Sequence, residues 1–253
     1  MSTVLVGRCE GVVQLTLRRP EVRNALNTAM LQELLTALDE ANTREADRVV
    51  VITGSGGAFC GGADLSEAKS DEQRLTRLQL MNDVILRLRD LPKPVIAKVD
   101  GPAVGGGWSL ALACDLIVAS ERSVFSAVFA QRGLSMDMGI SWQLCRSVGA
   151  YRAREIAFFG DLLSAADAGA LGLVNRVVPV DELDDVADGW ARRLARGARS
   201  ALSSNKQLLD HVAELDLPKA LALEMRHQTV NVSSPDAHEA RSAYRERRPP
   251  SFN

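Results

Sequence analysis

"PVIAKVDGPAVGGGWSLALACDLIVAS", residues 94–120, joins two β-rich runs through a glycine cluster and a segment with helical character. The β-rich runs are 94–101 and 115–120, and the helix between them is expected to begin at about Gly106. A helix between two strands is typical of a parallel sheet, because parallel strands need a long crossover connection. The stretch therefore predicts the α/β class.

The same alternation continues toward the start of the chain. Further strands and helices are expected, in alternation, at 12–19, 27–42, 48–54 and about 66–90. After about residue 150 the strand signal nearly disappears, apart from "LVNRVVP" at 173–179, and several helical patterns follow one another. We expect an α/β core over residues 1–195 and a C-terminal helical region over residues 196–253 that packs directly on the core.

The composition is that of an ordinary soluble globular protein. The chain has 253 residues, of which 46% are hydrophobic and 25% charged, and its formal net charge is −2. Such a balance gives no strong field for binding nucleic acid or an anionic membrane. The start of the sequence has no basic segment followed by an apolar run, and no stretch reaches the roughly 18 apolar residues of a membrane span. We expect a cytoplasmic protein with neither partner.

The cysteines and histidines do not form a metal-binding pattern. Four cysteines are scattered without a CxxC pair, and the three histidines all lie in the last quarter of the chain. The cysteines are expected to be buried, reduced thiols. No metal or redox cofactor is therefore expected.

Two glycine-rich segments follow expected strands, at 49–65 and 95–116. Glycine allows a ligand to approach backbone N–H groups closely, so a strand, glycines and a helix start can form an anion or oxyanion site. A phosphate-binding loop is weakly supported, because "GSGGAF" departs from GxGxxG and GxxxxGK[ST] is absent. Tight turns and close packing are the other explanation for the glycines. Two such clusters favour carbonyl activation, because a developing oxyanion needs two donors.

Five segments, taken in chain order, resemble the crotonase, or enoyl-CoA hydratase/isomerase, superfamily. They are "RRPEVRNALN" (18–27), "AFCGGADL" (58–65), "LPKPVIAKVDGPAVGGGWSLALACD" (91–115), "SVFSAVFAQRGLSMDMGISWQLCRSVG" (123–149) and "SPDAHEARSAYRERRPPSF" (234–252). The resemblance implies a ClpP-like fold of repeated ββα units with C-terminal helices. It also implies an acyl-CoA substrate, with coenzyme A as part of that substrate, and a homotrimer or dimer of trimers.

The resemblance assigns roles to residues in the glycine segments. The backbone N–H groups of Ala63 and Gly106 would form the oxyanion hole. The positions that match the coenzyme A path are Arg23, Ala25, Asp64 and Leu65. Two of these have simpler explanations: Asp64 as a cap of the next helix, and Arg23 as a solvated surface charge.

The sequence departs from the family's hydratases at the catalytic acids. Their two glutamates appear here as Ser109 and Phe129. Hydration needs one group to activate water and another to deliver a proton, and neither residue can replace a carboxylate efficiently. Ordinary hydratase activity is therefore in doubt.

Asp137 is the remaining candidate acid. The motif "GLSMDMGISWQL" (133–144) resembles members that shift double bonds, including epoxyphenylacetyl-CoA isomerases. One base suffices for that reaction, by taking a proton from C2 of a 3-enoyl thioester and returning it at C4. The neighbours Met136, Met138, Phe129 and Trp142 are expected to line the pocket, and desolvation by them should strengthen the base. The alternative is that Asp137 caps a helix beginning near Gly139.

Other interpretations remain open. The chain is interpreted as an acyl-CoA isomerase, with a hydratase that takes its acids from elsewhere, or an inactive acyl-CoA-binding subunit, as alternatives. A dehalogenase ranks lower, because the Trp that such an enzyme carries appears here as Phe129. Residues with possible binding roles are Leu78, Met81 and Ile85 for the acyl chain, and Arg247 or Arg248 for a coenzyme A phosphate.

Overall fold

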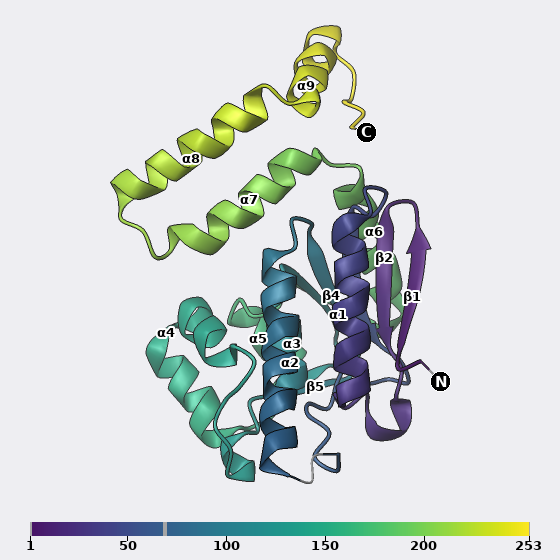
Figure 1. Cartoon of the computed structure of the whole chain (residues 1–253), viewed down its shortest axis with the longest axis vertical. Helices are drawn as coiled ribbons and strands as arrows, with labels where there is room; N and C mark the ends of the chain where they lie inside the picture. Colours follow the sequence, from purple (N-terminus) through teal and green to yellow (C-terminus); the bar gives the residue numbers. More distant parts are fainter. Residues whose placement is uncertain (1, 68–69, 253) are drawn as a thin grey trace.

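The computed structural model describes residues 2–67 and 70–252, and its centre is a six-stranded sheet (Figure 1). The strands are β1 (Val4–Cys9), β2 (Val12–Leu17), β3 (Val49–Gly54), β4 (Val95–Val99), β6 (Leu116–Ser120) and β9 (Arg176–Val178). Their order in the sheet is β1-β2-β3-β4-β6-β9. β1 is antiparallel to β2, and every later pairing is parallel. The α/β class predicted from the sequence is confirmed.

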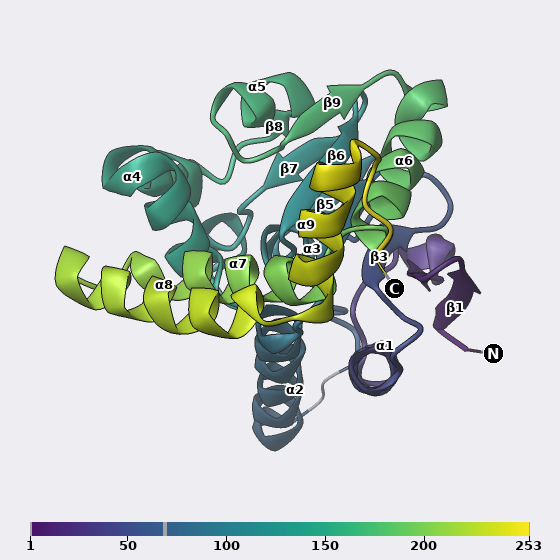
Figure 2. The ribbon, with the colours of Figure 1, turned by 90° about the horizontal axis from the view of Figure 1, so that it is seen from above.

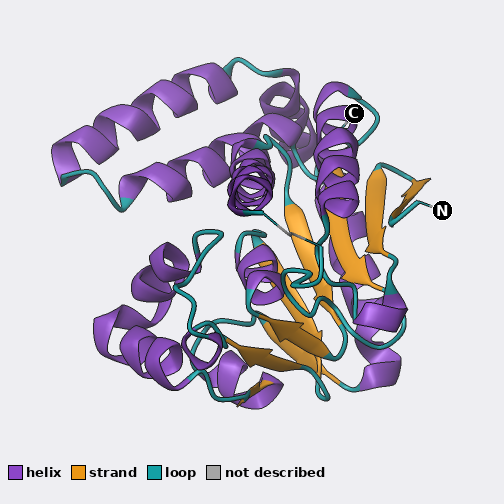
Figure 3. Ribbon diagram, turned by 60° about the horizontal axis from the view of Figure 1, so that its bottom comes forward, coloured by secondary structure: helices purple, strands orange, loops and turns teal. Residues whose placement is uncertain are grey.

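The helices cover both faces of this sheet, as Figure 3 shows. The helices before the C-terminal region are η1 (Pro20–Val22), α1 (Thr28–Thr43), α2 (Asp71–Asp90), α3 (Gly106–Leu112), η2 (Ala130–Arg132), α4 (Ile140–Phe159), α5 (Ala165–Ala170), η3 (Val180–Glu182) and α6 (Leu183–Ala195). In β3, Val50 and Ile52 face a core shared with α1, α2 and α3, whereas Val49 and Val51 face α6. Burial on both faces explains the continuous apolar run of β3.

A second, three-stranded sheet lies beside the first. It consists of β5 (Pro102–Val104), β7 (Val124–Ser126) and β8 (Leu163–Ser164), in the order β5-β7-β8. Gly101 allows β4 to turn into β5, since its φ is +71° and a Cβ there would lie 2.1 Å from the carbonyl oxygen of Gly57. The order β4, β5, α3 is the ββα unit that the family resemblance implies. The strand expected at 94–101 thus corresponds to β4, and it is followed directly by β5, which belongs to the second sheet.

Capping side chains determine where the two long helices α1 and α2 begin. Asn27 accepts a hydrogen bond from the N–H of Met30 (2.9 Å), which starts α1 where the sequence predicts it. Ser70 and Gln73 form a capping box at α2, so this helix begins later than the expected residue 66. Residues 68 and 69 of that expected helix lie outside the described residues.

The C-terminal helices form an arm that extends from the core (Figures 1 and 2). They are α7 (Arg199–Val212), α8 (Leu217–Val232) and α9 (Pro235–Glu246). Lys206 joins α7 to the core, because its Nζ lies 3.0 Å from Asp115 and donates to the carbonyl of Leu88 (2.9 Å). α8 lies on the far side of α7 from the sheet. Direct packing on the core, expected for the whole region, is correct for α7 and wrong for α8.

Of the helices in the described ranges, none combines the length and apolar character that crossing a membrane requires.

Candidate active site

The first glycine segment is held against the loop before α1. The N–H of Leu26 donates to the carbonyl of Gly62 (2.8 Å), and the N–H of Asp64 donates to the carbonyl of Leu26 (2.9 Å). These two bonds fix the peptides on both sides of Ala63. The N–H of Ala63 itself donates to no other residue in the described part of the chain.

The second glycine segment is joined to the first by another bridge. The N–H of Val104 donates to the carbonyl of Cys60 (3.0 Å). A Cβ on Gly62 would lie 3.4 Å from the nitrogen of Gly106, and a Cβ on Gly106 would lie 3.8 Å from the nitrogen of Ala63. The N–H of Gly106, like that of Ala63, makes no hydrogen bond to residues 2–67 or 70–252. Two neighbouring donors are thus free for a ligand oxygen.

Asp137 lies in the loop between η2 and α4. Its Oδ1 is buried and accepts no hydrogen bond from a described residue, while its backbone carbonyl accepts bonds from Ser109 Oγ and the N–H of Ile140, each at 3.3 Å. Burial raises the pKa of Asp137 to about 6, and the positive charge of Arg77 opposes that shift. Gly139 occupies the N-cap of α4 without a side-chain bond. The explanation of Asp137 as a side-chain helix cap is therefore wrong.

Apolar groups border Asp137 and Gly106. Met138 is buried with φ of +51°, and its sulfur lies 2.9 Å from the point that a Cβ on Gly106 would take. Two atoms of the Phe129 ring lie 3.9 and 4.0 Å from the corresponding point at Gly105. Ser109 is fully buried, and its Oγ bonds the carbonyl oxygens of Gly105 and Asp137 (3.3 Å each). The structure brings these sequence-predicted residues together around the Gly105–Gly106 turn.

The family model for enoyl-CoA hydratase/isomerase matches residues 7–253 of this chain. The chain belongs to the enoyl-CoA hydratase/isomerase family. The superfamily inferred from the five sequence segments is confirmed. Membership places the chain among enzymes that act on acyl-CoA.

Curated relatives in this family carry both hydratase and isomerase names. A probable enoyl-CoA hydratase of Rhodobacter capsulatus is 39% identical over 245 residues, which are 96% of this chain and 95% of that protein. The 2,3-dehydroadipyl-CoA hydratase of Escherichia coli is 37% identical over 252 residues, covering 100% and 99%. The 1,2-epoxyphenylacetyl-CoA isomerase of the same organism is 34% identical over 249 residues, covering 96% and 95%. The likeness alone does not separate the two reactions.

Solved structures of the family share the fold closely. The crystal structure of an enoyl-CoA hydratase from Polaromonas sp. JS666 matches with a TM-score of 0.95 at 34% identity, over 99% of each chain. That of an enoyl-CoA hydratase from Bacillus anthracis matches with a TM-score of 0.96 at 32% identity, over 99% of this chain and 98% of the other. The crotonase-type fold expected from the sequence is confirmed.

The residues that the family resemblance assigns to coenzyme A lie on and next to the first glycine segment. Arg23 is exposed, and its carbonyl accepts a bond from the N–H of Gly61 (2.8 Å). Ala25 is half-buried, and Leu65 is 65% exposed. These three positions are accessible to a ligand that approaches Ala63 from solvent.

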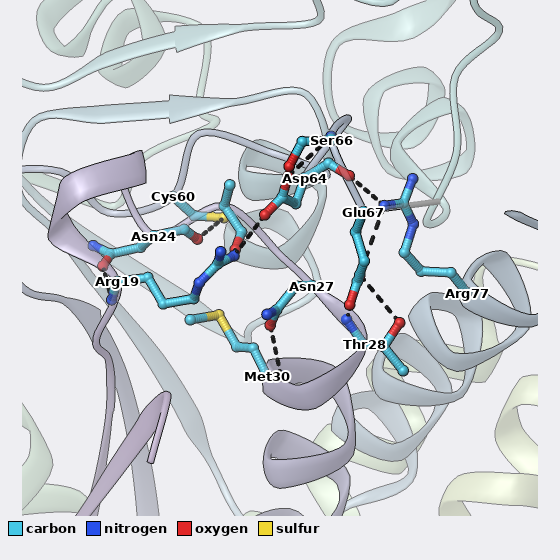
Figure 4. A network of polar contacts seen from close by, with 11 residues as sticks. Arg19, Asn24, Asn27, Thr28, Met30, Cys60, Asp64, Ser66, Glu67 and Arg77 are labelled. Carbon is cyan, nitrogen blue, oxygen red and sulfur yellow. Dashed lines mark hydrogen bonds and ion pairs between the residues drawn. The ribbon is translucent and has the colours of Figure 1, made fainter. Parts of the chain in front are cut away.

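Asp64 differs from the other three positions because its carboxylate already forms an ion pair and hydrogen bonds with other residues of the protein (Figure 4). Arg19 Nη1 lies 2.9 Å from it, and Ser66 donates to it through N–H (3.0 Å) and Oγ (2.7 Å). Burial alone would raise the pKa of Asp64, but these bonds and the Arg19 charge hold it below its ordinary value. Ser70 is the N-cap of α2, so the explanation of Asp64 as the cap of that helix is wrong.

Trp142 lies apart from Asp137. Its ring is 40% exposed, and the guanidinium groups of Arg146 and Arg89 lie 4.2 and 5.2 Å from its centre. This position faces the α7 side of α4, where Arg146 pairs with Glu214 at 3.7 Å. Met136 is half-buried and lines a cavity of about 100 Å³ beneath α4. Trp142 thus packs against arginines of α2 and α4, and its place in the pocket wall stays a prediction.

Several other sequence expectations are only partly met. Of the α2 candidates, Leu78 is 38% exposed, whereas Met81 is fully buried and Ile85 lies 3.8 Å from the Cβ point of Gly139. Arg248 is paired with Glu239 (2.6 Å) and so is already partnered within α9 and the tail. Its neighbour Arg247 caps α9.

The cysteines are free but not all buried. Cys60 and Cys114 are buried, whereas Cys9 and Cys145 are exposed, so the prediction of burial is wrong for two of the four. Burial raises the pKa of Cys60 to about 12, which argues against a reactive thiol there. Within the described residues, no three His, Cys, Asp or Glu side chains meet as a metal site would require.

Sequence reasoning missed two side chains that support the site. Buried Asn24 accepts a bond from the N–H of Arg19 (2.8 Å) and donates to the carbonyls of Ser55 (2.9 Å) and Ala58 (2.7 Å). Arg77 projects from α2 toward the first glycine segment (Figure 4). Arg77 could have been found by its spacing, since it lies one turn before buried Met81 on the inner stripe of α2.

Proposed function

We propose that the protein shifts the double bond of an enoyl-CoA thioester, with Asp137 as acid and base and the N–H groups of Ala63 and Gly106 as oxyanion donors. One observation carries this proposal. Half-buried Asp137 has a buried carboxylate oxygen, Oδ1, that accepts no hydrogen bond from a described residue, and it lies in the same site as two unused backbone donors. Buried polar atoms without partners are uncommon in folded proteins, and at a catalytic site a substrate can supply the missing partners.

The reaction uses these groups in two proton transfers. The Asp137 carboxylate takes a proton from C2 of a 3-enoyl thioester, and the C–H electron pair moves into a dienolate whose oxygen accepts bonds from Ala63 and Gly106. The protonated Asp137 then delivers its proton to C4, which leaves the double bond between C2 and C3. A pKa of about 6 suits both steps, because the group is ionised near neutral pH and still returns a proton readily. The change is redox-neutral, so we propose that no cofactor acts besides the coenzyme A of the substrate.

Two side chains favour isomerisation over hydration. The hydroxyl of Ser109 is engaged with two backbone carbonyls, and the ring of Phe129 has no proton to exchange. Adding water would need a second acid or base beside Asp137. Hydration is the second candidate because relatives at 39% and 37% identity are named hydratases.

We also propose that the protein works as a homotrimer or a dimer of trimers. The support is the exposed apolar face of the C-terminal arm. The large apolar side chains exposed along one side of α8 are Leu217, Leu221, Met225 and Val232. An exposed apolar surface of this kind is typical of a protein interface.

Proton NMR of a 3-enoyl-CoA in deuterated water tests the isomerase proposal. The wild type is expected to move the double bond and to place deuterium at C4, and Asp137→Asn is expected to be slower by about a hundredfold or more. Asp161→Asn, which changes an exposed Asp after α4, serves as the control and should retain the wild-type rate.

Two results would contradict the proposal. Hydration of a 2-enoyl-CoA by the wild type, without double-bond migration, would favour the hydratase. Binding of acyl-CoA without turnover of either substrate would favour an inactive binding subunit.

A further inference from the structure

Arg77 is a buried cation on the inner face of α2. Its side chain is 11% exposed, and it precedes the buried residues Met81, Val84 and Leu88 on one helical stripe. Its Nε is buried without a hydrogen-bond partner among the described residues. A charge in such surroundings is unfavourable unless neighbouring groups compensate it.

The contacts of Arg77 are with the loop that carries the first oxyanion donor (Figure 4). Its Nη1 donates to the carbonyl of Asp64, the residue that follows Ala63. The same nitrogen lies 3.9 Å from Glu67, whose carboxylate accepts a bond from the N–H of Thr28 (2.8 Å) at the start of α1. Arg77 therefore connects α2, the oxyanion loop and α1. Moving this side chain would release the peptide between Asp64 and Leu65, in the loop that carries Ala63.

The charge of Arg77 also acts on Asp137. The elements around Asp137 are α2, α3, its own loop with α4, and the oxyanion loop. α3 has no ionisable side chain, and Arg146, the first cation of α4, is engaged with Trp142 and Glu214. The carboxylates of the oxyanion loop, Asp64 and Glu67, are paired with Arg19 and Arg77. After burial, which raises the pKa of Asp137, the Arg77 charge is the influence that lowers it.

We propose that Arg77 is a positioning residue that serves both halves of the site, by fixing the peptide after Asp64 in the loop that carries Ala63 and by placing a positive charge that acts on the Asp137 carboxylate. Its catalytic consequence rests on the proposed isomerase function. Its electrostatic consequence can be measured without turnover.

The test compares Arg77→Gln, which removes the charge, with Arg77→Lys, which keeps the charge but loses the planar fork. Both are expected to lower kcat by about tenfold to a hundredfold, because a displaced oxyanion donor weakens transition-state binding, and to change KM by less than about threefold. The acid limb of kcat should move to higher pH in Arg77→Gln and stay in place in Arg77→Lys. Arg87→Met is the control, since Arg87 pairs with Asp39 (2.9 Å) at a half-exposed position of the same helix.

A direct titration separates this inference from the proposed function. Carbon-13 NMR of labelled aspartates, with Asp137→Asn used to assign the resonance, reports the pKa of Asp137 whether or not an enoyl-CoA is turned over. An upward shift in Arg77→Gln, absent in Arg77→Lys and Arg87→Met, supports the electrostatic role even if isomerisation fails. An unchanged Asp137 titration in Arg77→Gln, or wild-type kcat in both Arg77 variants, overturns the proposal.

Discussion

Asp137 shows how a group with a proposed catalytic role can oppose the stability of the fold that holds it. The residue is half-buried, and its Oδ1 is buried with no hydrogen-bond partner among the described residues, so the protein stabilises the neutral form more than the charged form. The pKa rises from an ordinary 3.8 to about 6 on folding. The folded state therefore binds more protons than the unfolded state between these values, and this group lowers the free energy of unfolding as pH rises through them.

Asp137→Asn is accordingly expected to stabilise the protein near neutral pH. The free energy of unfolding at pH 7 should rise by about 3 kcal/mol, because a pKa raised from 3.8 to about 6 corresponds to roughly that penalty. Near pH 4 the gain should largely vanish, because the wild-type carboxyl is then protonated in the folded state. Urea unfolding at the two pH values measures the difference. A gain that does not depend on pH would contradict this account of the carboxylate.

Neighbouring glycines of the second segment should respond differently to alanine. At Gly106 a Cβ would lie 2.9 Å from the Met138 sulfur, which is the flexible end of a side chain, whereas at Gly107 it would lie 2.1 Å from the carbonyl oxygen of Cys60. Gly106→Ala is expected to fold and to lose activity as Met138 shifts beside the oxyanion donors. Gly107→Ala is expected to lose several kcal/mol of stability, in the range of severe core overpacking. Thermal unfolding and isomerase rates distinguish the two.

An internal control for these substitutions is available in α6. Gly189 is a helical glycine, and a Cβ there would meet nothing within 4 Å. Gly189→Ala should stabilise the protein by up to about 1 kcal/mol without affecting the rate. Equal losses of stability at Gly106 and Gly107 would contradict the distinction drawn between them.

At the residue scale, short sequence motifs could predict the residues whose positions depend on local backbone geometry. Ala63, Gly106 and Asp137 could be placed because short glycine and Asp-containing motifs define their local geometry. Asn24 could not, because it acts through carbonyls that lie far away in the sequence. The spacing of apolar residues on α2 places Arg77 on the buried side of that helix, but it does not identify the carbonyl of Asp64 as its partner.

At the scale of elements, the length of a segment determined what the sequence could predict. β3 and β4 are six and five residues long and begin with consecutive apolar residues, VVVI and VIA, and long helices such as α1 have a cap and a repeating apolar face. β5, β7 and β8 have two or three residues each, too few to show a period. The pattern of the residues alone therefore did not predict the second sheet, although the family resemblance implied repeated ββα units.

An ion pair with low exposure, between Lys206 and Asp115, helps to attach α7 to the core, together with the pair between Asp210 and Arg89 of α2. The side chain of Lys206 is 7% exposed and that of Asp115 is 21% exposed. Burial raises the pKa of Asp115, and the neighbouring Lys206 charge counters that rise without cancelling it. Lys206→Met should lower the free energy of unfolding by about 3 kcal/mol, because it leaves a carboxylate buried without its partner.

The double variant Lys206→Met with Asp115→Asn tests whether the loss comes from the pair. It should recover part of the stability, because the unpaired charge is gone. Urea denaturation measures both variants. If the double variant were less stable than Lys206→Met by the full effect of Asp115→Asn alone, the two residues would be independent and the ion pair would not attach the helix.

At the scale of the whole molecule, the arm of α7, α8 and α9 leaves apolar side chains without a covering layer. Leu217, Leu221 and Met225 follow one another at intervals of four residues and are 70%, 55% and 66% exposed. Side chains at this spacing form a continuous stripe along α8. A second copy of the chain would bury that stripe if the proposed trimer forms.

Replacing Leu221 and Met225 by Glu should therefore dissociate the assembly. Sedimentation-velocity experiments are expected to show the wild type at the mass of three or six chains and the double variant at a lower mass, because buried carboxylates oppose association. Circular dichroism should show that the helices persist. A wild type that sediments as a monomer would exclude the proposed trimer.

The interlocked bridges between Leu26 and Ala63, and between Cys60 and Ala103, have a consequence for how new chemistry can arise. They hold the two proposed oxyanion donors, Ala63 and Gly106, in one unit, while Asp137 lies on a separate loop that these bridges do not include. In the proposed mechanism, the loops that bind the thioester oxygen are thus separate from the loop that supplies the acid and base. Substitutions in the loop of Asp137 can then direct a common enolate toward a different product, while the loops that bind the thioester oxygen stay unchanged.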